Sequence, residues 1–186
     1  MSEDRRDQIV TAALEVFGRY GYRRSSMDLI AQAARISRPA VYQYFPGKEA
    51  VFRAVGQKIA DEVLAAAARA GATRSGDVAD RLTEALAQKL DLFGGAIGAG
   101  FKAELFAEAG QLAGDVIASF HDRYADLVER VLAESGLPGL GRTISPRDVA
   151  LVLTDALPGI AQEPDAETAR RRLRQLVDLV VRGLSA

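Results

Sequence analysis

The 186-residue sequence contains no cysteine and a single histidine, His121. Without cysteine the chain can form neither a disulfide nor a thiolate metal site, and one histidine excludes metal sites that need several. No apolar run approaches the ~20 residues of a membrane span, and the polar, charged N-terminus does not resemble a secretory signal. β-Branched residues are sparse, and no segment alternates as a strand does. These absences favour a soluble, cytoplasmic, all-α protein that needs no metal or other cofactor.

The charges are nearly balanced overall but unevenly placed. Lysine and arginine number 24, and aspartate and glutamate number 25. Residues 1–58 contain ten basic and six acidic side chains, a net charge of +4, whereas the remaining residues carry −5. A basic N-terminal part on an acidic body is typical of a DNA-binding domain joined to a domain that does not contact DNA.

Apolar residues recur at spacings of three and four along most of the chain, which predicts about nine helices. The first helix contains Ile9 and Phe17, ends at Gly21 in a left-handed C-cap, and follows a frayed arm at residues 1–6. Two short helices are expected at 27–34 and 38–44. The remaining helices are expected at 48–69, 77–93, 101–111, 114–135, 146–162 and 165–184.

The two short helices are the centre of the N-terminal part. Ser25 or Ser26 caps the first, and Ser37 caps the second. In the second, Val41 and Phe45 are four residues apart, so both point inward and leave the opposite face outside. A helix this short is not stable alone. Supported from behind, its outer face can enter a DNA major groove.

Lys48 begins the next helix, where the positive end of the helix dipole disfavours a cation. A DNA phosphate bound at this position would offset the unfavourable placement. A solvated lysine is the plainer alternative. We expect Lys48 to bind phosphate.

A specific motif runs through this region. From Ser37 the chain reads Ser-x-x-x-Val-Tyr-x-Tyr-Phe-x-x-Lys-Glu, and it is preceded by Ile9, Ala13, Phe17, Gly21, Tyr22, Ser26, Ile30, Ala31 and Ala34 at matching intervals. Residues 9–52 thereby resemble the N-terminal domain of the TetR family of bacterial transcriptional regulators. Arg35 departs from the family's usual glycine in the turn, where a left-handed backbone would be mildly strained. Gly47 replaces the usual polar cap before the following helix.

The resemblance implies a helix-turn-helix domain at residues 1–47 and a helical ligand-binding and dimerisation domain at 48–186. Some side chains are expected to hold phosphates and others to meet base edges, with arginine suited to guanine and glutamine to adenine. The expected phosphate contacts are Ser26, Tyr42, Tyr44 and Lys48, and the expected base contacts are Arg38, Pro39, Ala40 and Gln43. Ser25 and Ser37 complete the predicted DNA-binding set.

The family also implies a small-molecule pocket among the middle helices, where aromatic residues gather. Its predicted lining is Leu86, Phe93, Phe101, Phe106, Phe120, His121 and Tyr124. Aromatic walls with a few polar groups suit a ligand site, and they suit an ordinary core equally well. The glycine-rich run at 94–100 lacks the Gly-Lys-Ser/Thr of a phosphate loop. The sequence does not identify the ligand.

The last two helices each carry a continuous apolar stripe. The resemblance implies that the stripes pair with those of a second subunit in a four-helix bundle, and a dimer would also join two weak DNA contacts into a strong one. The predicted interface is Val149, Val152, Leu153, Leu157, Leu173, Leu176, Val177, Val180 and Val181. The alternative is that both stripes face the chain's own core.

Catalysis is not expected. Ser119 and Asp122 are close to His121 in sequence but would point to different faces of one helix, so they cannot form a relay. The sequence thus predicts a transcriptional regulator, a repressor, that binds a palindromic operator as a homodimer and responds to a small molecule. Two alternatives remain: a helical small-molecule carrier or partner-binding dimer without operator specificity, and a ligand-independent architectural DNA binder.

Overall fold

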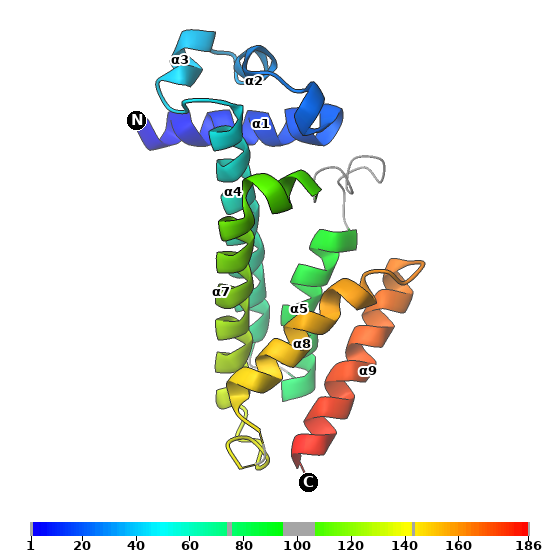
Figure 1. The fold of residues 1–186 in the computed structure, drawn as a ribbon. Helices are drawn as coiled ribbons and strands as arrows, with labels where there is room; N and C mark the ends of the chain where they lie inside the picture. The colour runs from blue at the N-terminus through cyan, green and yellow to red at the C-terminus, as the bar shows by residue number, and fades with distance from the viewer. Residues whose placement is uncertain (1, 74–75, 95–106, 143, 186) are drawn as a thin grey trace. The chain divides into compact units, whose positions relative to one another are not determined.

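The computed structural model describes residues 2–73, 76–94, 107–142 and 144–185, and most residues in these ranges are helical (Figure 1). The helices are α1 (Ser2–Arg24), α2 (Met27–Ala33), α3 (Arg38–Tyr42), α4 (Lys48–Gly71), α5 (Val78–Gly94), α7 (Gly114–Ala133), α8 (Pro146–Ile160) and α9 (Ala166–Ser185). Residues 107–112 are also helical. The predicted all-α class is confirmed. Residues 95–100 of the glycine-rich run and most of the helix predicted at 101–111 lie outside the described residues.

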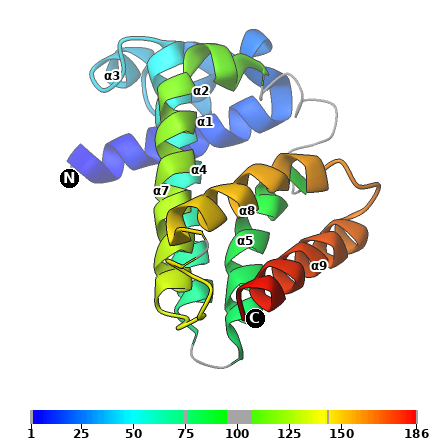
Figure 2. The ribbon, with the colours of Figure 1, turned by 60° about the horizontal axis from the view of Figure 1, so that its bottom comes forward.

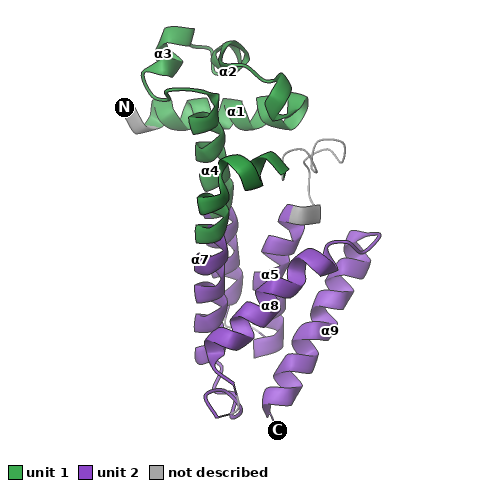
Figure 3. Cartoon of the chain, viewed as in Figure 1, with its two compact units in different colours: residues 1–60, 96–119 green, residues 61–95, 120–186 purple. Residues whose placement is uncertain are grey.

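Packing divides the chain into two compact units (Figure 3). The first comprises Met1–Ala60 and Ala96–Ser119, and the second comprises Asp61–Gly95 and Phe120–Ala186. The first unit therefore holds more than the predicted helix-turn-helix domain at 1–47. The predicted boundary after residue 47 does not coincide with the division into packed units, and as a boundary between two functional domains it stays a prediction.

In the first unit, α2 packs on α1, and α3 packs on α2. Their shared core consists of buried apolar side chains that include Ile9, Ala13, Phe17, Ile30, Val41, Val51 and Phe52. The frayed arm predicted at residues 1–6 is wrong, because α1 begins at Ser2. Arg5 Nη1 donates to Gln8 Oε1 at 3.0 Å, and the Arg6 guanidinium lies 5.0 Å from the centre of the Phe45 ring, so this turn has contacts that hold it. Gly21 has φ 75° and ψ 168°, so it interrupts α1 with a positive φ, as predicted, but outside the left-handed helical region.

In the second unit, α5 packs against both α8 and α9, and α8 packs against α9 (Figures 1 and 2). None of the described helices is long and apolar enough to cross a membrane. Five of the residues predicted for a dimer interface lie instead in the core of the protomer, at no more than 3% exposure: Val149, Leu153, Leu157, Leu173 and Val177. That part of the prediction is wrong, because the inner sides of α8 and α9 are covered by α5 and by each other. Leu176, Val180 and Val181 are half-buried.

Candidate DNA-binding site

The caps of the two short helices are those that the sequence predicts. The Ser26 hydroxyl accepts a hydrogen bond from the Leu29 N–H at 3.2 Å, and the Ser37 hydroxyl accepts one from the Ala40 N–H at 3.3 Å. Arg35 between them has φ 55°, the left-handed conformation expected of this turn. These interactions satisfy amide groups that a short helix would otherwise leave unpaired.

A further support of α2 comes from Gln8 in α1, which sequence reasoning missed. Gln8 Nε2 donates to the Ala34 carbonyl oxygen at 2.8 Å, so it satisfies a carbonyl at the C-terminal end of α2. The two residues are 26 positions apart, and only the packing of α2 on α1 brings them together.

The two sides of α3 have opposite environments, as predicted. Val41 is fully buried and Phe45 is 3% exposed, so both anchor the helix to the core. The side chains on the other side are accessible: Arg38, Pro39 and Gln43 are exposed, Tyr42 is 43% exposed, and Ala40 and Tyr44 are half-buried. The outer face of α3, defined by these six residues, presents a guanidinium, an amide and two phenols to the solvent.

Arg38 is held in place on this surface. Its Nη1 donates to Asp28 Oδ2 at 3.1 Å, its Nη2 donates to the Tyr42 hydroxyl at 3.5 Å, and its guanidinium lies 5.6 Å from the centre of the Tyr42 ring. The hydrogen bond to Tyr42 and the charge of Asp28 raise the pKa of Arg38 above its usual value. The guanidinium is therefore oriented before DNA binds. One of its N–H groups already donates to the Asp28 carboxylate, so that hydrogen bond competes with a bond to DNA.

Ser25 does not belong to the exposed surface. Its side chain is 5% exposed, and its hydroxyl donates to the Gly21 carbonyl oxygen within the core. The prediction that Ser25 contacts DNA is therefore wrong, because the kink at Gly21 turns this hydroxyl inward. Ser26 alone caps α2.

Lys48 has an internal role that the sequence did not reveal. Its Nζ donates to the Tyr22 carbonyl oxygen at 2.8 Å and to the Ser25 carbonyl oxygen at 3.0 Å, and it lies 4.2 Å from the centre of the Tyr22 ring. Burial lowers the pKa of Lys48, while Glu108 opposes the shift. The two carbonyl oxygens and the Tyr22 ring thus offset the unfavourable position of this cation at the start of a helix. One of three N–H groups is left for a phosphate, so phosphate binding by Lys48 stays a prediction.

Hydrogen bonds and ion pairs join the helical segment 107–112 and the start of α7 to α1 and α4. Glu108, which is 7% exposed, accepts a hydrogen bond from Arg23 Nε at 2.6 Å. Arg53 Nη1 donates to the Leu112 carbonyl oxygen at 2.8 Å, and its Nη2 pairs with Asp115 at 2.5 Å. These contacts join positions between 59 and 85 residues apart, so the sequence offered no local signal for them.

The predicted ligand residues of the second unit lie on α5 and α7. Leu86 and Tyr124 are fully buried, and Phe120 is 9% exposed. The Tyr124 hydroxyl donates to the Ala85 carbonyl oxygen and accepts from the Lys89 N–H at 3.2 Å, which ties α7 to α5. Phe101 and Phe106 lie outside the described residues, as does the side chain of Phe93.

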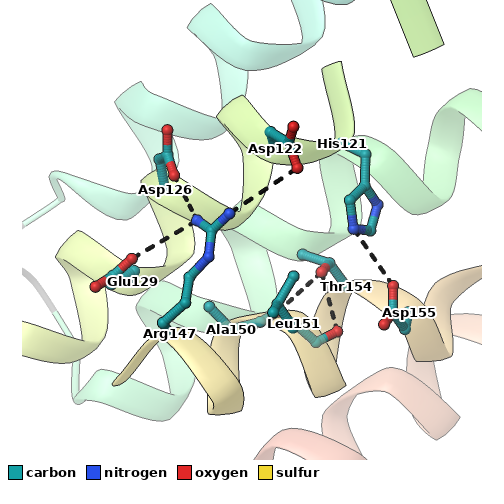
Figure 4. Close-up of polar contacts among 9 residues, drawn as sticks. All are labelled: His121, Asp122, Asp126, Glu129, Arg147, Ala150, Leu151, Thr154 and Asp155. Carbon is teal, nitrogen blue, oxygen red and sulfur yellow. Dashed lines mark hydrogen bonds and ion pairs between the residues drawn. The ribbon is translucent and has the colours of Figure 1, made fainter. Parts of the chain in front are cut away.

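Figure 4 shows the polar contacts between α7 and α8. His121 Nε2 lies 3.5 Å from Asp155 Oδ1 on α8, so its partner is not one of its neighbours in sequence. Arg147 pairs with Asp126, and it lies 3.6 Å from Glu129 and 4.0 Å from Asp122. Because these carboxylates are 38% to 69% exposed, the contacts orient α8 more than they stabilise it.

The fold and the exposed α3 define a helix-turn-helix protein, and the comparisons with known proteins agree. Residues 9–55 match the bacterial regulatory proteins of the tetR family. The transcriptional activator FasR of Mycolicibacterium smegmatis is 40% identical over 62 residues, which cover 33% of this chain and 28% of FasR. The transcriptional repressor Rv1474c of Mycobacterium tuberculosis is 35% identical over 75 residues, 38% of this chain and 40% of that repressor.

The similarity in structure extends beyond the N-terminal part. A transcriptional regulator from Rhodococcus sp. Rha1 superposes with a TM-score of 0.74 over 97% of this chain and 98% of its own, at 20% sequence identity. The sequence matches to these two curated relatives cover 33% and 38% of this chain, whereas the likeness of fold spans 97% of it. Residues 9–55 thus match the helix-turn-helix domain of the tetR family of bacterial regulatory proteins, and the fold of the chain is similar to that of a TetR-family transcriptional regulator from Rhodococcus sp..

Proposed function

We propose that this protein is a ligand-responsive transcriptional repressor that binds a palindromic operator as a homodimer. The observation that supports this most strongly is the outer face of α3, which is exposed while Val41 and Phe45 are buried behind it. Arg38 suits guanine, Gln43 suits adenine, and Pro39 or Ala40 suits a thymine methyl group. Ser26, Tyr42, Tyr44 and the free N–H of Lys48 would contact phosphates.

Dimerisation in this proposal uses the outer sides of α8 and α9. Val152 is 54% exposed and Leu179 is 72% exposed, although both are large and apolar. Two copies joined through these side chains would present two α3 helices to one duplex, at half-sites about 34–36 Å apart. Because the second contact is then intramolecular, affinity for the operator rises well above that of one α3 helix.

Ligand response would reach DNA through the contacts that hold residues 107–119 in the same unit as the helix-turn-helix. Glu108 binds Arg23 at the end of α1, and Arg53 on α4 binds Leu112 and Asp115. A ligand that displaces this segment would shift α1 and α4 with it. Such a ligand changes DNA binding only if it binds the two conformations with different affinity.

Selection from a random DNA pool tests the proposal directly. The protein is expected to enrich one palindrome, and Gln43→Ala is expected to relax the preference at one base step of each half-site, at a cost of about 1–3 kcal/mol. Gln111→Ala, which changes an exposed glutamine outside α2 and α3, serves as the matched control. Enrichment of no palindrome, or an unchanged preference in Gln43→Ala, would contradict the proposed role of α3.

A further inference from the structure

Lys89 on α5 is a buried lysine in the second unit. The residue is 4% exposed, and its Nζ lies 5.4 Å from the centre of the Phe120 ring and 5.1 Å from that of the Tyr124 ring. The two rings meet edge to face, with centres 5.5 Å apart. Tyr124 is fixed by its hydrogen bonds to α5. The ammonium group therefore lies against a rigid aromatic corner.

In the part of the chain that the structure describes, this ammonium has no partner of opposite charge. Among the residues that the structure describes, Lys89 Nζ makes no hydrogen bond and no ion pair. The charge of Asp155 acts on Lys89, but that carboxylate lies 3.5 Å from His121 Nε2 (Figure 4). Burial lowers the pKa of Lys89, and Asp155 opposes the shift only in part. Aromatic rings attract a cation, but they offer it no acceptor lone pair.

Packing alone does not account for a lysine here. Buried ammonium groups are ordinarily paired, because removing the charge from water is unfavourable. A methionine would fill a similar volume against Phe120 and Tyr124 without that penalty. A buried cation that has no anionic partner among the described residues is favourable where an anionic ligand binds beside it, and it is unfavourable in an ordinary core.

We propose that Lys89 recognises the anionic group of the effector, a small organic carboxylate whose apolar part lies against Phe120 and Tyr124. The cation over these two rings is the single ammonium group of Lys89, and one positive charge matches a monoanionic carboxylate better than a phosphate dianion. The inference rests on the proposed function, since it names the chemical class of the ligand to which the repressor responds.

The test measures direct binding to the full chain without DNA. Benzoate and octanoate are each compared with the neutral amide of the same skeleton, by calorimetry and by the shift in Tm. Wild type is expected to prefer the carboxylates by about tenfold or more, and Lys89→Met to bind them about 30-fold more weakly while binding the amides equally well. Arg130→Met, which removes an exposed cation of α7, is expected to match wild type.

Equal binding of a carboxylate and its amide by wild type would overturn the proposal, and that comparison stands even if Lys89→Met does not fold. Undiminished carboxylate binding by Lys89→Met would overturn it as well. A gel shift with the selected operator distinguishes failure of the anion site from failure of the proposed function. If the carboxylates bind but leave operator affinity unchanged, the anion site stands and the ligand-responsive part of the proposed function fails. If the operator is bound selectively and wild type shows no preference for carboxylates, the anion site fails and the DNA-binding function stands.

Discussion

Replacing Lys48 by methionine separates an internal role from a DNA-binding role. In the structure, Lys48 Nζ donates to the carbonyl oxygens of Tyr22 and Ser25 at 2.8 and 3.0 Å, and it lies over the Tyr22 ring. These carbonyls belong to the end of α1 and to the loop before α2. Methionine keeps the contact with the ring but leaves both acceptors without this donor.

The expected loss in stability follows from these contacts. A hydrogen bond to a charged group contributes about 1.5–3 kcal/mol, and the two bonds of Lys48 are not additive because they share one ammonium group. The half-buried site also gives water some access to the two carbonyls, and the Tyr22 carbonyl still accepts a hydrogen bond from the Ser25 N–H at 3.2 Å, so the loss is reduced. We expect Lys48→Met to lower the free energy of unfolding by about 2–3 kcal/mol. For a chain of this length that corresponds to a fall in Tm of about 5–10 °C.

Urea denaturation followed by circular dichroism measures the stability, and fluorescence anisotropy on operator DNA at several salt concentrations measures the binding. Arg19→Met is the control. Arg19 is exposed and lies over the Tyr20 ring, so this substitution removes one positive charge from the N-terminal part, as Lys48→Met does. Unchanged stability of Lys48→Met, together with weaker DNA binding and a salt slope reduced by about one, would refute the internal role and identify a phosphate ligand.

Three further predictions concern other surfaces of the protein. Asp28→Asn releases Arg38 from its carboxylate and removes a negative charge beside α3, so DNA affinity at low salt is expected to rise by about two- to fivefold; a fall in affinity would show that Asp28 positions Arg38 for DNA. Leu179→Glu is expected to yield a folded monomer by light scattering and to weaken operator binding by about 100-fold, because Leu179 is 72% exposed and supports no protomer core; an unaltered dimer would exclude this part of α9. Burial lowers the pKa of Lys89 below its ordinary value of 10.5, so the charged form penalises folding at neutral pH and the penalty disappears as pH rises toward 10.5. Lys89→Met is therefore expected to be more stable than wild type at neutral pH by a margin that shrinks in alkali, as urea titrations at several pH values will show; a constant margin would contradict this linkage.

Local chemistry made the helix-turn-helix predictable. Ser26 and Ser37 cap their helices because each side chain reaches an amide three residues ahead, an interaction contained within the sequence window. The inward turn of Val41 and Phe45 follows from helical spacing alone, and so does the exposure of Gln43 on the other side. The positive φ of Arg35 was expected from the resemblance to the TetR family, which usually has glycine at this position of the turn.

Contacts between distant segments were not predictable in this way. The unfavourable position of Lys48 at a helix start led us to predict a DNA phosphate as its partner, and nothing local in the sequence revealed that the carbonyl oxygens of Tyr22 and Ser25 accept its hydrogen bonds. An apolar stripe likewise indicates which side of a helix avoids water and not what covers it. Leu153 and Val177 are therefore covered by their own protomer, whereas Leu179, outside the predicted set, is left exposed.

The most direct test of the central claim is the affinity of the protein for its selected palindrome when the spacing between the half-sites is changed. Inserting about 5 bp at the centre turns one half-site by half a helical turn away from the other. If two α3 helices of one dimer read both half-sites together, affinity falls by about 100-fold, to that of a single half-site. Equal affinity for the two spacings would show that the α3 helices do not read the operator as a fixed pair.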